Sequence, residues 1–249
     1  MTTRRDFLKT MTMASAGLAL GTGDLLGAPI SVSQRKAAAD KVKIAYVGIG
    51  NRGEQIIGDF ARTGMVEVVA LCDVDMGAPH TQKVMNMYPK AKRFRDFRQM
   101  FDKAGNDFDA VAIATPDHSH FPITMLALAS GKHVYVEKPL ARTFYEAELL
   151  MQAALKRPNL VTQVGNQGHS EANYFQFKAW MDAGIIKDVT AVTAHMNNPR
   201  RWHGWDSGIY KLPSGQQLPN DMDWDTWLGV VPYHEYNKDC LLYTSDAAD

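Results

Sequence analysis

Apolar runs alternate with helical patterns along the first two thirds of the chain. Helical periodicity and capping residues predict helices over residues 54–62, 81–88, 97–104, 121–130 and 143–156. The short apolar runs that separate them read as strands, at 42–47, 66–72, around 93–94, 109–114, 133–136 and 160–164. Strands that are apolar throughout and alternate with helices are typical of a parallel sheet covered on both faces. We therefore expect an α/β fold with a doubly wound parallel sheet.

The pattern changes after residue 165. A polar turn at 165–169 opens a predicted helix over 171–182, and Gly184 is expected to end it. Residues 189–195 then alternate between apolar and polar, as an antiparallel strand does. All five tryptophans lie in this later part of the chain, at positions 180, 202, 205, 224 and 227. We expect a domain boundary near 165 and the start of a second, open-sheet α/β domain.

The two ends of the chain read differently from its middle. Arg4 and Arg5, the Phe-Leu-Lys that follows, and a short, weakly apolar run to Leu20 resemble a twin-arginine export signal. The run is too short and polar to span a bilayer, so we expect a periplasmic protein without a membrane span. An amphipathic N-terminal arm is the alternative.

The last ten residues, CLLYTSDAAD, back-translate into the end of a transposon adapter used in DNA library preparation. We therefore expect the natural sequence to stop at about Asp239, with a genuine C-terminal segment as the alternative. The predicted organisation is a signal and linker over 1–39, a dinucleotide-binding Rossmann domain over 40–165, an interrupted substrate and oligomerisation domain over 166–239, and an adapter-derived tail over 240–249.

Charge and composition exclude several classes of function. Lys plus Arg and Asp plus Glu number 27 each, so the net charge is zero and argues against a nucleic-acid or polybasic membrane binder. A hydrophobic content of 45% is that of a globular protein. The two cysteines, Cys72 and Cys240, imply no disulfide framework.

A glycine-rich turn links the first strand to the first helix with the spacing Gly-x-Gly-x-x-Gly. The first glycine permits the turn, the second lets a pyrophosphate approach the backbone, and the third lets the helix pack on the strand. Asp73 ends the second strand about 20 residues later, where a carboxylate can accept hydrogen bonds from ribose hydroxyls. These features predict a bound dinucleotide, with the turn contributing Gly48, Ile49, Gly50, Asn51, Arg52 and Gly53.

Polar residues also follow two further strands, at Thr115-Pro116-Asp117-His118-Ser119-His120 and at Glu137-Lys138-Pro139. Ligands gather at the carboxyl ends of the strands in such sheets. A lysine held there between an acid and a proline could bond a substrate hydroxyl and help move a proton. A structural ion pair between Lys138 and Glu137 or another acid is the alternative. The Asp117, His118 and His120 cluster could bind a metal, but no further ligand cluster supports this, and we assign no metal site.

Four segments together resemble the glucose–fructose oxidoreductase / inositol dehydrogenase / rhizopine-catabolism (Gfo/Idh/MocA) family. They are the glycine turn, Cys72-Asp73-Val74-Asp75, Ala114-Thr115-Pro116 with His120, and Gly131-Lys132-His133-Val134-Tyr135-Val136-Glu137-Lys138-Pro139-Leu140. The match covers about residues 41–165. The polar turn after 165 and Asp223-Trp-Asp-Thr-Trp-Leu-Gly229 resemble an exported branch of the family.

The resemblance implies an NAD(P)-dependent oxidoreductase that transfers hydride at a carbinol carbon of a sugar, cyclitol or related polyol. Lys138 would contact the reacting hydroxyl, and a cis peptide bond would precede Pro139. The cofactor-binding residues expected beyond the glycine turn are Asp73, Thr115, Pro116, His118, His120, Glu137, Lys138 and Gln167. The family also implies a homo-oligomer for the full-length protein.

Some alternatives stay open. Asp73 favours NAD over NADP because it repels a 2′-phosphate, although Arg52 could neutralise phosphate charge. The family's second catalytic element, Asp-x-x-x-His, does not occur before Asp239. We expect it beyond that point, so this chain would be impaired or inactive. Trp202 and Trp205 suit either sugar stacking or core packing.

A redox-neutral, NAD-dependent glycoside hydrolase is the alternative function, and Glu137-Lys138-Pro139 weighs against one such group. Methyl transfer from S-adenosylmethionine and a non-catalytic binding protein on the same scaffold rank lower.

Overall fold

The structure is a computed structural model that describes residues 41–194 and 214–238 of the 249-residue chain. The predicted export signal, His195, the Trp202–Trp205 segment and the adapter-like tail lie outside the described residues. The chain divides into two compact units, the first containing residues up to Val164 and from Pro213 onward, and the second spanning Gly165–Leu212.

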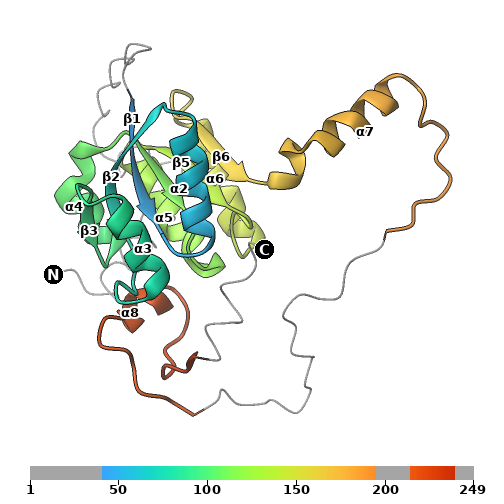
Figure 1. The fold of residues 1–249 in the computed structure, drawn as a ribbon. Helices are drawn as coiled ribbons and strands as arrows, with labels where there is room; N and C mark the ends of the chain where they lie inside the picture. The colour runs from blue at the N-terminus through green and yellow to red at the C-terminus, as the bar shows by residue number, and fades with distance from the viewer. Residues whose placement is uncertain (1–40, 195–213, 239–249) are drawn as a thin grey trace. The chain divides into compact units, whose positions relative to one another are not determined.

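The first unit is built on a six-stranded sheet with the order β3-β2-β1-β4-β5-β6 (Figure 1). Neighbouring strands pair in parallel in the β2–β3, β1–β2, β1–β4 and β4–β5 pairs. The doubly wound parallel α/β fold is thus confirmed. The strands are β1 (Val42–Val47), β2 (Val66–Cys72), β3 (Lys92–Phe94), β4 (Ala110–Ile113), β5 (His133–Glu137) and β6 (Thr162–Gly165).

Helices connect these strands close to where the sequence predicts them. Their ends follow local signals: Pro79 starts one, Asp96 caps another by accepting from Arg98 N, and Thr143 forms a capping box with Glu146. The helices are α2 (Arg52–Arg62), α3 (Pro79–Met87), α4 (Phe97–Ala104), α5 (His120–Ala129) and α6 (Phe144–Leu155), with short 3-10 turns η1 (Gly105–Asp107) and η2 (Asp117–Ser119).

The sheet carries a hydrophobic core on each face. Alternate residues of a strand point to opposite faces, so Val47 and Ala45 of β1 enter one cluster while Tyr46 and Ile44 enter the other. The first cluster contains buried side chains of α4, α5 and α6, and the second contains those of α2 and α3. Burial on both faces explains why the strands are apolar throughout.

Residues 214–238 return to the first unit through the short helix α8 (Trp224–Leu228). Asp223 caps this helix by accepting from Thr226 N, and its own amide donates to the Val74 carbonyl at 2.8 Å. Trp224 and Trp227 stack at 4.6 Å and pack with Met222, Leu228 and Val74. The segment thus packs on the loop that follows β2, an arrangement that the sequence did not predict.

The second unit, over its described residues, contains a 3-10 turn, η3 (Gln167–Ser170), and helix α7 (Ala172–Asp182). The predicted helix over 171–182 is confirmed. The predicted strand is wrong over 189–194, where the backbone has no regular structure. A strand needs a neighbour to pair its backbone groups, and none of the described strands pairs with this segment.

Candidate functional site

The polar residues singled out in the sequence come together because of the strand order. β2, β1, β4 and β5 are adjacent and parallel, so their carboxyl ends meet at one edge of the sheet. That edge carries the glycine turn after β1, Asp73 after β2, Thr115 after β4 and Lys138 after β5. This is the edge at which open α/β sheets bind ligands.

The glycine turn needs its glycines for close approach. Gly48 has φ +78°, and a Cβ there would meet the Ala114 carbonyl carbon at 2.6 Å. A Cβ on Gly53 would overlap the Gly48 carbonyl group. A Cβ on Gly50 would project toward the exposed imidazole of His80. The turn therefore packs against the end of β4 while α2 begins at Arg52, next to its last glycine.

Asp73 is fixed by the turn that it faces. Its Oδ2 accepts from Ile49 N at 2.9 Å, and its Oδ1 accepts from Asp75 N at 3.0 Å. Burial raises the pKa of the Asp73 carboxyl, and these two amide bonds and the nearby His80 oppose the shift. Each carboxylate oxygen keeps a further lone pair, so the side chain can still accept a hydroxyl donor.

His120 joins the ends of β4 and β5. Its Nε2 lies 2.8 Å from the Thr115 carbonyl oxygen, and its Nδ1 lies 2.7 Å from the Pro139 carbonyl oxygen. A neutral imidazole has one N–H, so both contacts are hydrogen bonds only when the ring is protonated. With its two nitrogens facing carbonyl oxygens, this side chain holds the two polar turns together. The Thr115 hydroxyl is buried and has no hydrogen-bond partner among the described residues.

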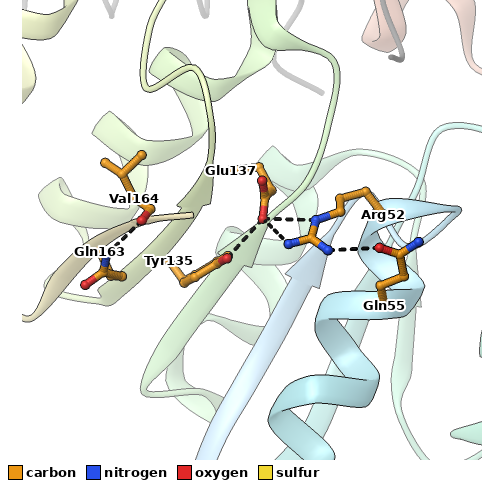
Figure 2. A network of polar contacts seen from close by, with 6 residues as sticks. All are labelled: Arg52, Gln55, Tyr135, Glu137, Gln163 and Val164. Atoms are coloured by element: carbon orange, nitrogen blue, oxygen red, sulfur yellow. Dashed lines mark hydrogen bonds and ion pairs between the residues drawn. The ribbon is translucent and has the colours of Figure 1, made fainter. Parts of the chain in front are cut away.

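Glu137 receives three donors on a single oxygen (Figure 2). Arg52 donates from Nε at 3.2 Å and from Nη2 at 3.0 Å, and the Tyr135 hydroxyl donates at 3.0 Å, all to Oε1. The other oxygen, Oε2, is buried without a partner among the described residues. Burial, followed by the charge of Glu137, raises the pKa of Tyr135 to about 12.

Lys138 follows β5 and precedes a proline with a cis peptide bond, as the family resemblance implies. Within the described part of the chain no ion pair or hydrogen bond engages its ammonium group. The alternative of an ion pair with Glu137 or another acid is not seen among the described residues, and Glu137 pairs with Arg52 instead. Asp117 faces this region: burial raises the pKa of its carboxyl, while the charges of His120 and Lys138 oppose that shift.

His118, one of the predicted cofactor-binding residues, contacts the segment around α8. His118 is buried, donates from Nε2 to the Trp227 carbonyl at 2.6 Å, and packs edge-on against the Trp227 ring. Gln167 starts η3 in the second unit, so its contact with a cofactor stays a prediction. Pro116 precedes η2 and shapes the turn that carries Asp117. No group of three or more metal-ligating side chains occurs among the described residues.

Sequence reasoning assigned no role to Tyr135 or to α8. For Tyr135 a signal existed, because residues two apart in a strand share a face, which places it beside Glu137. For α8 the signal was the Asp223 cap ahead of two tryptophans, but five residues carry too little periodicity to predict a helix.

Comparison with known proteins decides the family. A family model for an oxidoreductase family with an NAD-binding Rossmann fold, Gfo/Idh/MocA, matches residues 42–165. The chain belongs to the Gfo/Idh/MocA family. The family resemblance, the Rossmann fold and the NAD cofactor are thereby confirmed.

Relatives of the chain within this family have two kinds of name. An inositol 2-dehydrogenase from Salmonella paratyphi B is 28% identical over 191 residues, which cover 75% of this chain and 54% of that protein. A glycosyl hydrolase family 109 protein from Shewanella pealeana is 31% identical over 167 residues, covering 61% of this chain and 36% of that protein. The chain thus spans about half or less of the length of these relatives.

One solved structure that is similar to the chain is also an inositol dehydrogenase. The scyllo-inositol dehydrogenase from Lactobacillus casei, solved with bound NAD(H) and scyllo-inositol, is 29% identical and has a TM-score of 0.54. The similarity covers 61% of this chain and 44% of that one.

The Gfo/Idh/MocA residues present here fit a bound dinucleotide. The glycine turn leaves no room for side chains at Gly48 and Gly53, which brings the backbone amides of the turn to the surface of the site. Asp73 retains acceptor capacity beside that turn. Two buried oxygens without partners, Thr115 Oγ1 and Glu137 Oε2, lie at the ends of the next two strands. No helix among the described residues is long and apolar enough to cross a membrane.

Proposed function

We propose that the chain belongs to an NAD-dependent oxidoreductase that acts on a hydroxyl-bearing carbon of a sugar, cyclitol or related polyol. The observation that carries this proposal is the position of Lys138 and the absence of an ion pair at its ammonium group among the described residues. Lys138 stands at the cofactor edge of the sheet, after Glu137 and before the cis proline, and the described residues offer its ammonium group no ion pair. A cation left available beside a dinucleotide site suits a group that contacts substrate.

Each residue of the edge then has a distinct task. Lys138 donates a hydrogen bond to the reacting hydroxyl oxygen and so orients the hydroxyl-bearing carbon toward the cofactor. Asp117 supplies a carboxylate within electrostatic reach of that lysine. The nicotinamide, when bound, supplies the hydride acceptor for the carbinol carbon. Glu137, Thr115 and Asp73 hold the cofactor through acceptors that the protein leaves unused.

The choice of NAD over NADP is supported by Asp73 and Arg52 together. Asp73 faces the turn where the adenosine ribose would lie, and a carboxylate there repels a 2′-phosphate. Arg52 is the cation in the turn that could compensate, but its guanidinium is engaged by Glu137 and Gln55. The turn therefore offers a 2′-phosphate no unpaired arginine.

A second candidate is a redox-neutral glycoside hydrolase that oxidises a sugar transiently and reduces it again. The similarity to glycosyl hydrolase family 109 proteins, at 29–31% identity, favours keeping it. Both candidates use the same cofactor and the same first oxidation step. They differ in whether reduced cofactor accumulates and whether a glycosidic bond is cleaved.

The test uses the whole chain and its full-length parent. Isothermal titration with NAD, NADP and S-adenosylmethionine identifies the cofactor, and we expect NAD to bind more tightly than NADP and S-adenosylmethionine not to bind. Reduced nicotinamide formed from NAD with inositols and simple sugars then reports oxidation, which Lys138→Met should abolish without weakening NAD binding by more than about threefold. Cleavage of a glycoside with exchange of hydrogen at C2, and no net reduced cofactor, would favour the hydrolase instead. Failure of NAD to bind would refute both candidates.

Export through the twin-arginine pathway is proposed from residues 1–39 alone. That pathway carries folded proteins, which suits an enzyme that binds its cofactor before export. The homo-oligomer expected for the full-length protein likewise rests on the family resemblance.

A further inference from the structure

Arg52 belongs to the glycine turn in sequence, but its side chain reaches the end of β5. Both Nε and Nη2 contact Glu137 Oε1, at 3.2 and 3.0 Å, across 85 positions of sequence (Figure 2). The third nitrogen, Nη1, donates to Gln55 Oε1 at 2.9 Å, one turn further along α2. The guanidinium is thus anchored on its own helix and directed at Glu137.

This ion pair is shielded from water. The Arg52 side chain is 14% exposed and that of Glu137 is 2% exposed. The other ion pairs of α2 are far more exposed, as in Arg62–Asp59, where the side chains are 76% and 54% exposed. Charges that are buried together interact more strongly than exposed ones, and loss of one partner leaves the other uncompensated.

Tyr135 adds a third donor from the same strand as Glu137. Its hydroxyl donates to Oε1 at 3.0 Å, and its ring packs edge-on against Phe60 of α2 at 5.4 Å. Helix α2 therefore holds both donor side chains, one directly and one through its ring. Since all three donors meet at Oε1, they fix the rotation of the carboxylate.

The second oxygen shows what this rotation achieves. Oε2 is buried and has no hydrogen-bond partner among the described residues, although a buried carboxylate oxygen ordinarily has one. A carboxylate held through one oxygen at the cofactor edge of the sheet presents the other to a ligand donor. Within the proposed function, the donors available there are the ribose hydroxyls and the carboxamide of the nicotinamide half of the cofactor.

We propose that Arg52 and Tyr135 are positioning residues that hold Glu137 by one oxygen so that the other accepts a hydrogen bond from the nicotinamide half of NAD. This inference rests on the proposed function and gives Arg52 a role beyond the glycine turn. The competing role for Arg52 is direct contact with the pyrophosphate. In that case its loss would weaken the binding of NAD and of any other ligand that carries a pyrophosphate.

Titration with NAD and with ADP separates these roles, because ADP has the pyrophosphate but lacks nicotinamide and its ribose. With the whole chain, Arg52→Gln should weaken NAD binding by about tenfold or more while ADP binding changes by less than about twofold. Glu137→Gln should give the same pattern, and the double variant should lose no more than Glu137→Gln alone, because the two residues act through one contact.

Two further variants keep the result interpretable. Arg62→Gln, at an exposed arginine of the same helix, is the matched control and should leave both affinities unchanged. Tyr135→Phe removes one hydroxyl and keeps the ring, so it decides the matter if Arg52→Gln does not fold; it should weaken NAD and spare ADP. Equal weakening of NAD and ADP by these variants, or no weakening of NAD, would overturn the inference. Binding of neither ligand by the unsubstituted chain would instead refute the proposed function on which it rests.

Discussion

Single residues of the glycine turn illustrate how close contacts constrain this sequence. Gly53 and Gly58 both lie in α2, but only Gly53 faces backbone, where an added Cβ would overlap the Gly48 carbonyl. At Gly58 the only atom of the described residues within 4 Å of an added Cβ is Arg62 Nη1, at 3.9 Å. The two positions therefore separate the effect of packing from the helix propensity of alanine.

We predict opposite effects of the same substitution at these two glycines. Gly53→Ala should destabilise the protein by about 1–3 kcal/mol, because the turn or the helix must shift to admit the methyl group. Gly58→Ala should stabilise it by about 0.4–1 kcal/mol, because alanine restricts the unfolded chain and fits the helix. Chemical denaturation of both variants measures this difference, and equal changes would argue against the close packing of the turn.

At the scale of single residues, the sequence predicts which residues belong to the site better than it predicts which of them are in contact. The glycines, Asp73 and Glu137-Lys138-Pro139 were recognisable because their spacing along one chain segment is characteristic. The partner of Arg52 was not, because it lies 85 positions away and a guanidinium can reach several acids from the same backbone position. Phosphate neutralisation was accordingly the simpler expectation for that arginine.

Elements show the same division between local and distant causes. The helices and strands of the sheet were predictable since apolar runs, caps and glycines act within a few residues. α8 was missed, and the strand over 189–194 was wrongly predicted, because a five-residue helix and a lone strand depend on what packs against them. α8 is held by its contacts with Val74 and His118 rather than by its own propensity.

The packing of α8 on His118 predicts a pH dependence of stability. Burial lowers the pKa of His118 from its ordinary value of 6.5, outweighing the bond to the Trp227 carbonyl, which favours the protonated ring. At this position the unfolded chain therefore binds a proton more readily than the folded one as the pH falls from about 7 to 5. The free energy of unfolding should decline over that range by at most about 1.4 kcal/mol per pH unit.

Replacing His118 by a neutral amide should reduce this decline. We expect His118→Gln to flatten the dependence of unfolding free energy on pH in that range, because glutamine does not titrate. An unchanged slope in His118→Gln would contradict the lowered pKa of His118 in the folded state.

For the molecule as a whole, cofactor binding is expected to couple to unfolding. A ligand that binds only the folded state stabilises it by about 2.7 kcal/mol at a concentration one hundred times its dissociation constant. NAD should therefore raise the thermal midpoint of the first unit, and NADP at the same concentration should raise it less, because Asp73 repels the 2′-phosphate. Differential scanning calorimetry with each cofactor measures this, and an equal or larger shift with NADP would contradict the assignment of Asp73.

The return of residues 214–238 to the first unit sets an order for its assembly during synthesis. The glycine turn, Asp73 and Lys138 are all translated well before Asp221, which pairs with Arg95 across 126 positions, and Trp227, which meets His118 across 109. Contacts of such separation require closure of a long loop and form late, whereas the paired strands of the sheet, β1 and β4 included, lie closer together in sequence. The cofactor edge of the sheet can therefore form on the ribosome before residues 214–238 pack on the loop that follows Asp73.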